Sequence, residues 1–585
     1  MLLVKRLIQT ILNMLNLFYT FQKNKRQTIS AILGFLAIAG IVLFISFVLP
    51  PSEQEQQFFL GLSVARFAIA VLFFVFLLVT FSALFLSVKK RGQWQNEIEA
   101  KLDLLISQYS LLVLVLLYSF LMITGTILLL TIPPIPNSLI SLEPVRVRLL
   151  APLLWSFLSS LALIVLIKLF YSERIREQTF ICTVERGLLI FGVFLFTFFF
   201  YEHFAAWIGW VNKTKYSYWN LLAGEFLEGR LYIKNPPANT HDLTNYDGRW
   251  YVPSPPLPAV LMMPLAYVVG GNNISTAEFS MFFGAVNAVI VFLILEQLSF
   301  RQWIKLSRPN ILLLVLLFAF GTPHLWVSIN GRFWFVSQIL TVTFLALAIL
   351  GSLQLWSPWM IGLCIGLAIS ARPNGLMTWP FVFAVTMQIL RENGETIDLK
   401  KIFLWAFKSA LPIGAIIISL FIYNYARFEN FFDFGYVTID GNPVIVYNAQ
   451  TYGLFSLHYV PYNLKVMFLY LPEIRLGGQW PILPSGAGMS LFVATPALVY
   501  LFHRYENKLW IWGAWLAVLF NFLLLVSYHN TGMDQFGYRY ILDVSIPLIA
   551  LLSVTFRKKI PWHFVLMIVL SILINLYGAN WFMNG

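Results

Sequence analysis

Residues 215–258 read KYSYWNLLAGEFLEGRLYIKNPPANTHDLTNYDGRWYVPSPPLP, a long polar and aromatic stretch between strongly apolar segments. Polar and charged groups are costly in hydrocarbon, so we expect this stretch to stand outside a bilayer as an ordered loop. It carries two aspartates, a histidine, several basic side chains and many aromatic rings. This mixture favours a phosphorylated or sugar-bearing ligand over a plain connector. The rest of the chain then serves as the scaffold that holds the loop.

The composition supports a membrane scaffold. Of the 585 residues, 59% are hydrophobic and 11% are charged, whereas a soluble domain carries about 25% charged residues. Apolar runs of about 20 residues recur, and each can cross a hydrocarbon core about 30 Å thick. We therefore predict an all-α polytopic membrane protein with roughly 15 transmembrane helices and exclude a soluble or disordered chain. The candidate spans lie near 31–49, 64–88, 104–131, 149–170, 188–210, 279–297, 311–328, 334–352, 356–371, 374–390, 403–424, 489–503, 509–527, 541–556 and 562–580.

Basic residues indicate the orientation of these spans. A cytoplasmic N-terminus places the Lys- and Arg-rich connectors 301–308, 391–401, 504–508 and 557–559 inside, as the positive-inside bias expects. The apolar segment 255–271 contains several prolines and is short for a span. Counting it as a span would place the later basic connectors outside, so we expect it to lie along the outer interface.

Three regions follow from this topology. Residues 1–30 are predicted to form an amphipathic segment on the cytoplasmic side, near anionic lipid. Residues 31–187 are predicted to form an N-terminal transmembrane module, and residues 188–585 the core. The core carries two long outer loops, 211–278 and 425–488. We expect a multi-pass protein of the plasma (inner) membrane whose functional loops lie together outside the cytoplasm.

Several motifs in the core resemble those of the GT-C glycosyltransferases, the superfamily that includes protein mannosyltransferases and lipid A aminoarabinose transferases. The similarity is greatest to bacterial family 39-like membrane proteins and covers residues from about 188 to 556. The motifs are LAGEFLEGRLYIKNPP, HDLTNYDGRWYVPSPPLPAVLMMPL, ISARPNG, NYARFENFFDFGY, GMSLFVATPAL and FGYRYILD. The resemblance implies a GT-C-like helical bundle with an outer first loop. It also implies transfer of a sugar from a polyprenyl-phosphate donor to a lipid, glycan or protein acceptor at the outer face of the membrane.

One position departs from this family pattern. The resemblance implies an acidic residue shortly after the first core span, as catalytic base or metal ligand, but this chain has Lys215 or Tyr216 there. Either another acid substitutes, or the chain is a catalytically inactive GT-C-like scaffold or binding protein. A transporter or flippase of lipid-linked saccharides is a third alternative, disfavoured because few ionisable residues lie deep in the spans. No motif requires a cofactor, and the sequence leaves open whether a divalent cation takes part.

Transfer from a polyprenyl phosphate needs a base for the acceptor hydroxyl and cations for the leaving phosphate. Asp247 in NYDGRWY is the first candidate for the base, and Asp242 in THDL is the second. The alternative is that these aspartates cap turns or pair with Arg249 and His241, because Asp-Gly is a common turn pair.

The phosphate is expected at Arg372 and Arg539, with Arg249 or Arg332 in support. A guanidinium group presents a fixed fork of donors that matches phosphate oxygens. The alternative is that these arginines reach toward lipid headgroups. Glu202 lies in the outer half of a predicted span, where an acid usually faces a cavity.

Further side chains are candidates for substrate contacts through stacking or hydrogen bonds: His241, Tyr246, Trp250 and Asp433. For Asp433 the favoured alternative is a hydrogen bond that holds the second long loop together. No metal-ligating residues are predicted. The net charge of +13 includes many Lys and Arg residues that the topology requires at the cytoplasmic edge. The expected partners are therefore the sugar donor, the acceptor and membrane lipids, and not nucleic acid.

Overall fold

A computed structural model describes residues 179–210, 215–436, 438–475, 480–556 and 559–584. The predicted segment 1–30 and the first four candidate spans lie outside the described residues. The chain divides into two compact units, residues 1–192 and 193–585. The account below concerns the second unit.

The described part of the chain is mostly helical and has little sheet. Six helices are long and apolar enough to cross a membrane: α7 (Thr179–Trp207), α10 (Thr276–Phe300), α13 (Phe333–Leu353), α16 (Leu399–Phe428), α20 (Leu509–Val526) and α22 (Trp562–Asn584). Helices α11 (Arg308–Phe320) and α12 (His324–Asn330) meet at a bend of 52° and make a seventh if they are counted as one span. These helices confirm the helical, membrane-type character predicted for this part of the chain.

Four predicted spans are shorter or broken. The segment 356–371 forms α14 (Pro358–Ile369), and 374–390 begins as the 3₁₀ helix η2 (Pro373–Thr378) before α15 (Trp379–Glu392). The segment 489–503 forms α19 (Leu491–Ala494) and η5 (Pro496–Leu501), and 541–556 forms η6 (Arg539–Val544) and α21 (Ser545–Val554). Proline explains several of these breaks, because it cannot donate the backbone hydrogen bond that continues an α-helix.

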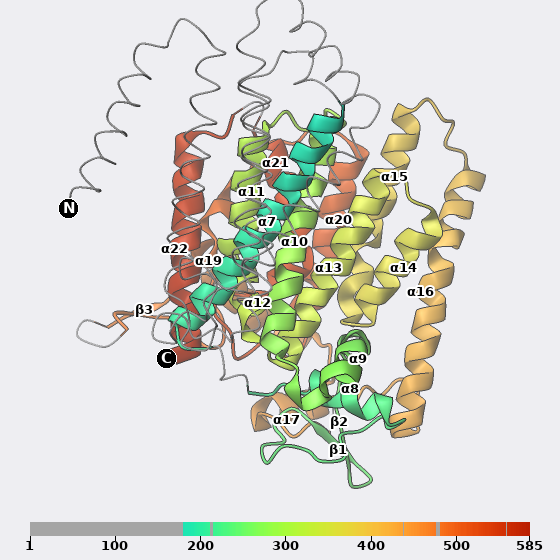
Figure 1. Cartoon of the computed structure of the whole chain (residues 1–585), viewed down its shortest axis with the longest axis vertical. Helices are drawn as coiled ribbons and strands as arrows, with labels where there is room; N and C mark the ends of the chain where they lie inside the picture. Colours follow the sequence, from blue (N-terminus) through green and yellow to red (C-terminus); the bar gives the residue numbers. More distant parts are fainter. Residues whose placement is uncertain (1–178, 211–214, 437, 476–479, 557–558, 585) are drawn as a thin grey trace, which may run out of the picture. The chain divides into compact units, whose positions relative to one another are not determined.

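Helix α13 lies at the centre of the unit. It contacts α9, α10, α12, α14, α15 and η6, and 83% of its most apolar window is buried. Helix α16 is peripheral, with 17% of the corresponding window buried and with Phe403, Ile418 and Ile422 exposed. Figure 1 shows α13 among the other helices of the unit and α16 along their edge. An exposed apolar face of this kind suits contact with lipid.

The first predicted outer loop contains ordered elements. They are α8 (Trp219–Leu227), β1 (Thr244–Tyr246), β2 (Arg249–Tyr251), α9 (Leu257–Val269) and η1 (Gly271–Asn273). Tyr246 pairs with Arg249 across the antiparallel hairpin, so Asp247 and Gly248 form its two-residue turn. Both turn residues have positive φ, 49° and 71°, as a type I′ hairpin turn requires.

The second outer loop is also partly ordered. It contains α17 (Pro443–Tyr452), η3 (Leu457–Tyr459), α18 (Val460–Leu464), η4 (Lys465–Leu469), and the short strands β3 (Glu473–Ile474) and β4 (Ile482–Leu483). Figure 1 shows α17 at the same end of the unit as α8, α9 and the β1–β2 hairpin.

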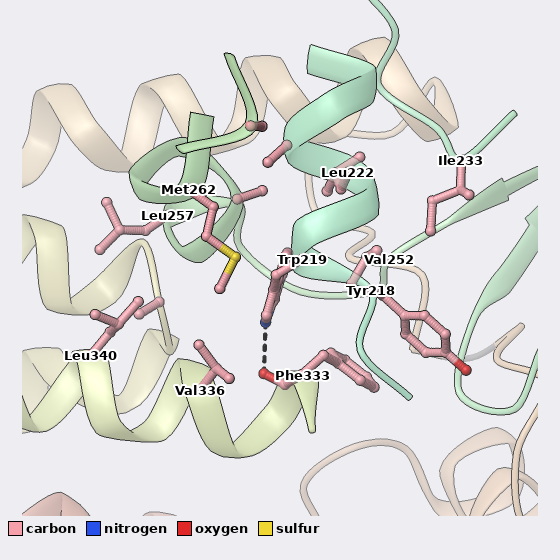
Figure 2. Packing of buried hydrophobic residues seen from close by; sticks show 14 of the residues in the cluster. Tyr218, Trp219, Leu222, Ile233, Val252, Leu257, Met262, Phe333, Val336 and Leu340 are labelled. Atoms are coloured by element: carbon pink, nitrogen blue, oxygen red, sulfur yellow. Dashed lines mark hydrogen bonds between the residues drawn. The ribbon is translucent and has the colours of Figure 1, made fainter. Parts of the chain in front are cut away.

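A buried apolar cluster fixes the first loop to α13. Trp219 and Leu222 of α8 pack with Met262 of α9 against Val336 of α13, and Trp219 Nε1 donates a hydrogen bond of 2.6 Å to the Phe333 carbonyl (Figure 2). Burial of each large apolar side chain contributes about 1.5–3 kcal/mol. The loop is therefore an ordered structure, as predicted, and α9 is a short helix of 13 residues.

The two loops predicted to lie outside, 211–278 and 425–488, pack against each other. The Asp242 amide donates to the Asp440 carbonyl at 2.5 Å, and the Asp440 amide donates to the Leu243 carbonyl at 2.7 Å. Arg427 Nη1 donates to the Val252 carbonyl at 2.8 Å. These contacts join the two loops, and two of them are made by Asp242 and its neighbour Leu243.

Candidate functional site

An ion pair joins two segments that are far apart in sequence. Arg372 caps the start of η2, directly after α14, and its Nη1 lies 3.1 Å from Asp543 Oδ1 on η6. Asp543 is buried and also accepts hydrogen bonds from Asn374 Nδ2 at 2.7 Å and from Gln338 Nε2 at 3.3 Å. Three donors from two elements, η2 with its N-cap and α13, thus hold one carboxylate.

Arg539 completes a pair of arginines around one aromatic ring. The Arg372 guanidinium lies 4.8 Å from the Tyr540 ring centroid, and the Arg539 guanidinium lies 5.0 Å from it. Arg539 Nε donates to the Gly532 carbonyl at 3.0 Å. Among the described residues its two terminal nitrogens bond no acceptor, and neither of them is fully enclosed. Arg539 therefore presents a free guanidinium fork beside the paired Arg372.

Asp242 lies within electrostatic range of Arg539. Its carboxyl side chain is 25% exposed and its backbone has φ 63°. The Asp242 amide donates to the Asp440 carbonyl, and the Asp440 amide donates to the carbonyl of the next residue, Leu243. Burial raises the pKa of Asp242, while His241 and Arg539 act in the opposite direction. A carboxyl with a raised pKa, within electrostatic range of a cation that can bind phosphate, suits a general base.

Arg332 is a third arginine, and it lies among aromatic rings. Its guanidinium is 5.7 Å from the Trp210 ring centroid, 5.8 Å from that of Tyr216 and 5.1 Å from that of Phe582. The Tyr216 ring lies 5.2 Å from the His241 ring, and His241 Nε2 is 3.7 Å from Asp242 Oδ1. These contacts connect Arg332 to Asp242.

Two phenylalanines connect Arg332 to Arg539. The Phe335 ring lies 6.1 Å from the Phe582 ring and 4.7 Å from the Arg539 guanidinium. We call the group formed by Arg332, Arg372, Arg539, Asp242 and Asp543 the arginine cluster. It combines three guanidinium cations with two carboxylates, of which Asp242 is partly exposed and Asp543 is buried.

Several predicted site residues lie elsewhere. Asp247 and Arg249 are exposed in the β1–β2 hairpin, where Arg249 lies 5.1 Å from the Tyr232 ring. Asp247 is one of the two turn residues of that hairpin, as in the alternative to a catalytic role that its sequence allows. The hairpin position keeps both side chains at the surface of the loop.

The remaining predicted residues are mainly in packed positions. Tyr246 lies 5.7 Å from the Phe428 ring, and Trp250 packs against the buried cluster of Figure 2. Asp433 Oδ1 accepts a hydrogen bond of 2.7 Å from the Gly435 amide, which closes a local turn. Glu202 is buried on α7.

Asp543 is the important residue that sequence reasoning missed. It belongs to the motif FGYRYILD and lies in the predicted span 541–556. An acid in an apolar segment is costly unless it has a partner. An acid within an apolar segment is therefore the sequence signal for such a residue, and Asp543 shows it as clearly as Glu202 does.

Comparison with known proteins adds no match: no family model, no curated protein and no solved structure matches this chain. Within the described residues, no group of three or more His, Cys, Asp and Glu side chains is placed to hold a metal ion.

Proposed function

We propose that this chain is a membrane glycosyltransferase that moves a sugar from a polyprenyl-phosphate donor to an acceptor at the outer face of the plasma (inner) membrane. The observation that carries the proposal is that Arg372 and Arg539 both contact the Tyr540 ring, with the carboxyl of Asp242 within electrostatic reach of Arg539. The motifs similar to GT-C enzymes support the same reaction class.

The proposed reaction uses three groups of the arginine cluster: Asp242, Arg372 and Arg539. The bond between sugar C1 and the phosphate oxygen breaks, and a bond forms between C1 and the acceptor oxygen. Asp242 takes the proton of the acceptor hydroxyl, and Arg539 with Arg372 neutralises the polyprenyl phosphate that leaves. Donors aimed at developing charge are usually a large contribution to catalysis.

Asp242 is the preferred base over Asp247. Asp242 is partly buried, is fixed by the second loop and lies near Arg539, whereas Asp247 is exposed in a hairpin turn. The family pattern expects an acid at Lys215 or Tyr216. The Tyr216 ring contacts His241, the sequence neighbour of Asp242. Asp242 is therefore our candidate for the acid that substitutes.

The inactive scaffold remains the second candidate, and one observation favours it. Tyr216 stacks on Trp334 at a centroid distance of 5.7 Å, and Lys215 is exposed. These contacts are those of an ordinary packed loop, and they would persist in a protein that binds a lipid-linked sugar without transferring it.

A transfer assay distinguishes the two candidates. The full chain is reconstituted in nanodiscs and given a polyprenyl-phosphate-linked radiolabelled sugar together with an envelope extract as acceptor source. We expect release of free polyprenyl phosphate, and a loss of about 10²–10⁴-fold in rate in Asp242→Asn. The Glu473→Gln variant removes an exposed carboxylate of the second loop and serves as a control. Binding of the donor without any release would support the scaffold instead.

A further inference from the structure

Arg332 is a partly buried cation without an acceptor. Among the described residues, no carboxylate lies within ion-pair distance of its guanidinium, and Nε is enclosed and bonds no acceptor. The two terminal nitrogens also bond no acceptor there, and they are not fully enclosed. Burying a charged group without a hydrogen-bond partner is costly. Such an arrangement favours an anionic ligand at the open end of the guanidinium.

The backbone around Arg332 is fixed, which limits the region that its side chain can reach. The preceding Gly331 has φ +74°, and a Cβ atom there would lie 2.5 Å from the Ala277 amide nitrogen. On the other side, the Phe333 amide donates to the Tyr216 carbonyl at 3.0 Å. Arg332 is thus held between α10 and the start of the first outer loop.

The rings around Arg332 leave one further donor without a partner. The Trp334 indole Nε1 is enclosed and bonds no acceptor among the described residues. Trp334 and Arg332 both contact the Tyr216 ring, at 5.7 Å and 5.8 Å. An oxygen-rich group bound here would have both a guanidinium and an indole N–H within its surroundings.

The electrostatic setting agrees with an anionic ligand. Burial lowers the pKa of Arg332, and Asp534 and Tyr216 only partly oppose this effect. Asp534 acts at a longer range than an ion pair. A bound anion would restore the stabilisation that burial removes.

We propose that Arg332, with Trp210, Tyr216, Trp334 and Phe582, forms a second anion subsite that binds the acidic group of a saccharide acceptor. This Arg332 subsite is separate from the Arg372–Arg539 pair, because the Phe335 and Phe582 rings lie between them. The identification of the ligand as the acceptor rests on the proposed function. The geometry behind it is that His241 and Tyr216 connect Arg332 to Asp242, which is also within electrostatic range of Arg539.

The acidic group can be a carboxylate or a phosphate, and three small sugars separate these sources. Glucose, glucuronate and glucose 6-phosphate share a pyranose ring and differ at C6. Saturation-transfer-difference NMR titrations with the full chain in nanodiscs give an apparent dissociation constant for each. We expect at least one acidic sugar to bind about tenfold more tightly than glucose, since charge-assisted hydrogen bonds are the strong ones. Equal binding of all three sugars overturns the proposal.

Variants assign the binding to Arg332. Arg332→Gln should weaken the acidic sugar about tenfold and leave glucose unchanged. Arg332→Lys keeps the charge but loses the fork, so its loss should be smaller. Arg475→Gln, which removes an exposed arginine paired with Glu473 at 2.8 Å, is the matched control. Unchanged binding in a folded Arg332→Gln or Arg332→Lys variant contradicts the proposal.

These measurements do not require turnover. If the chain binds acidic sugars through Arg332 but has no transferase activity, the proposed function is rejected and the subsite stands as a binding site. Transfer activity combined with Arg332-independent binding would reject the subsite alone.

Discussion

Replacing Asp543 by Asn tests how the arginine cluster is organised, because two physical effects predict opposite results. The carboxylate of Asp543 is buried and holds Arg372, Asn374 and Gln338 through contacts of 3.1, 2.7 and 3.3 Å. An asparagine can accept through one oxygen only, and its amide group would face the donors. Arg372 would then lose its counter-charge and its fixed position.

Simple electrostatics predicts tighter phosphate binding in Asp543→Asn. A carboxylate about 8 Å from a phosphate repels it by about 2 kcal/mol at an effective dielectric constant of 20. Its removal would strengthen binding about 30-fold. Loss of position predicts the reverse, because a charge-assisted hydrogen bond from Arg372 contributes about 1.5–3 kcal/mol. We expect the second effect to dominate, since an uncompensated buried arginine also destabilises the fold by about 3–5 kcal/mol.

The assay is binding of farnesyl phosphate, a short isoprenoid phosphate, to the purified chain, together with its thermal unfolding midpoint in detergent. Asp543→Asn should bind about tenfold more weakly and unfold at a lower temperature. Gln338→Met removes a donor to Asp543 without a charge change, and it should weaken binding in the same direction if Asp543→Asn does not fold. Glu473→Gln is the control for a lost exposed carboxylate. Tighter binding with an unchanged unfolding midpoint would refute the reasoning.

Three further predictions follow from the same structure. Burial raises the pKa of Asp242, so the transfer rate should begin to fall, as the pH is lowered, at a higher pH than an ordinary carboxyl with a pKa near 3.9 would give. A pH–rate profile checks this, and a fall that begins only at or below about pH 3.9 would contradict it. Arg539→Lys keeps the charge but loses the fork, so it should weaken farnesyl phosphate binding, and unchanged affinity would remove Arg539 from the phosphate site. Gly331→Ala should lower the unfolding midpoint, because the new Cβ would lie 2.5 Å from the Ala277 amide nitrogen; an unchanged midpoint would show that the turn adapts.

Local patterns in the sequence predicted the features that depend on local physics. Apolar runs identified the long helices, and Asp247-Gly248 lies in the hairpin turn that this residue pair commonly forms. The positions of Arg372 and Arg539 at the ends of apolar segments also marked them as site candidates. In each case the information lies within a few residues of the feature.

The rest depends on contacts between distant segments. Arg372 and Asp543 are 171 residues apart, and nothing in either motif indicates which span ends meet. Asp242 and Asp247 have similar local surroundings in the sequence. What distinguishes them is Asp440 of the second loop, which fixes the backbone of Asp242. The broken helices around η2 and η6 likewise reflect prolines together with the tertiary contacts of the arginine cluster.

The central claim is that the arginine cluster holds an isoprenoid phosphate beside Asp242. A cryo-EM map of the full chain in nanodiscs that retain native lipid extract tests it most directly. We predict density for a phosphate with an isoprenoid tail at Arg372 and Arg539, with the Asp242 carboxyl facing the same ligand. A map in which those guanidinium groups contact only protein atoms, and in which Asp242 pairs internally, would contradict the claim.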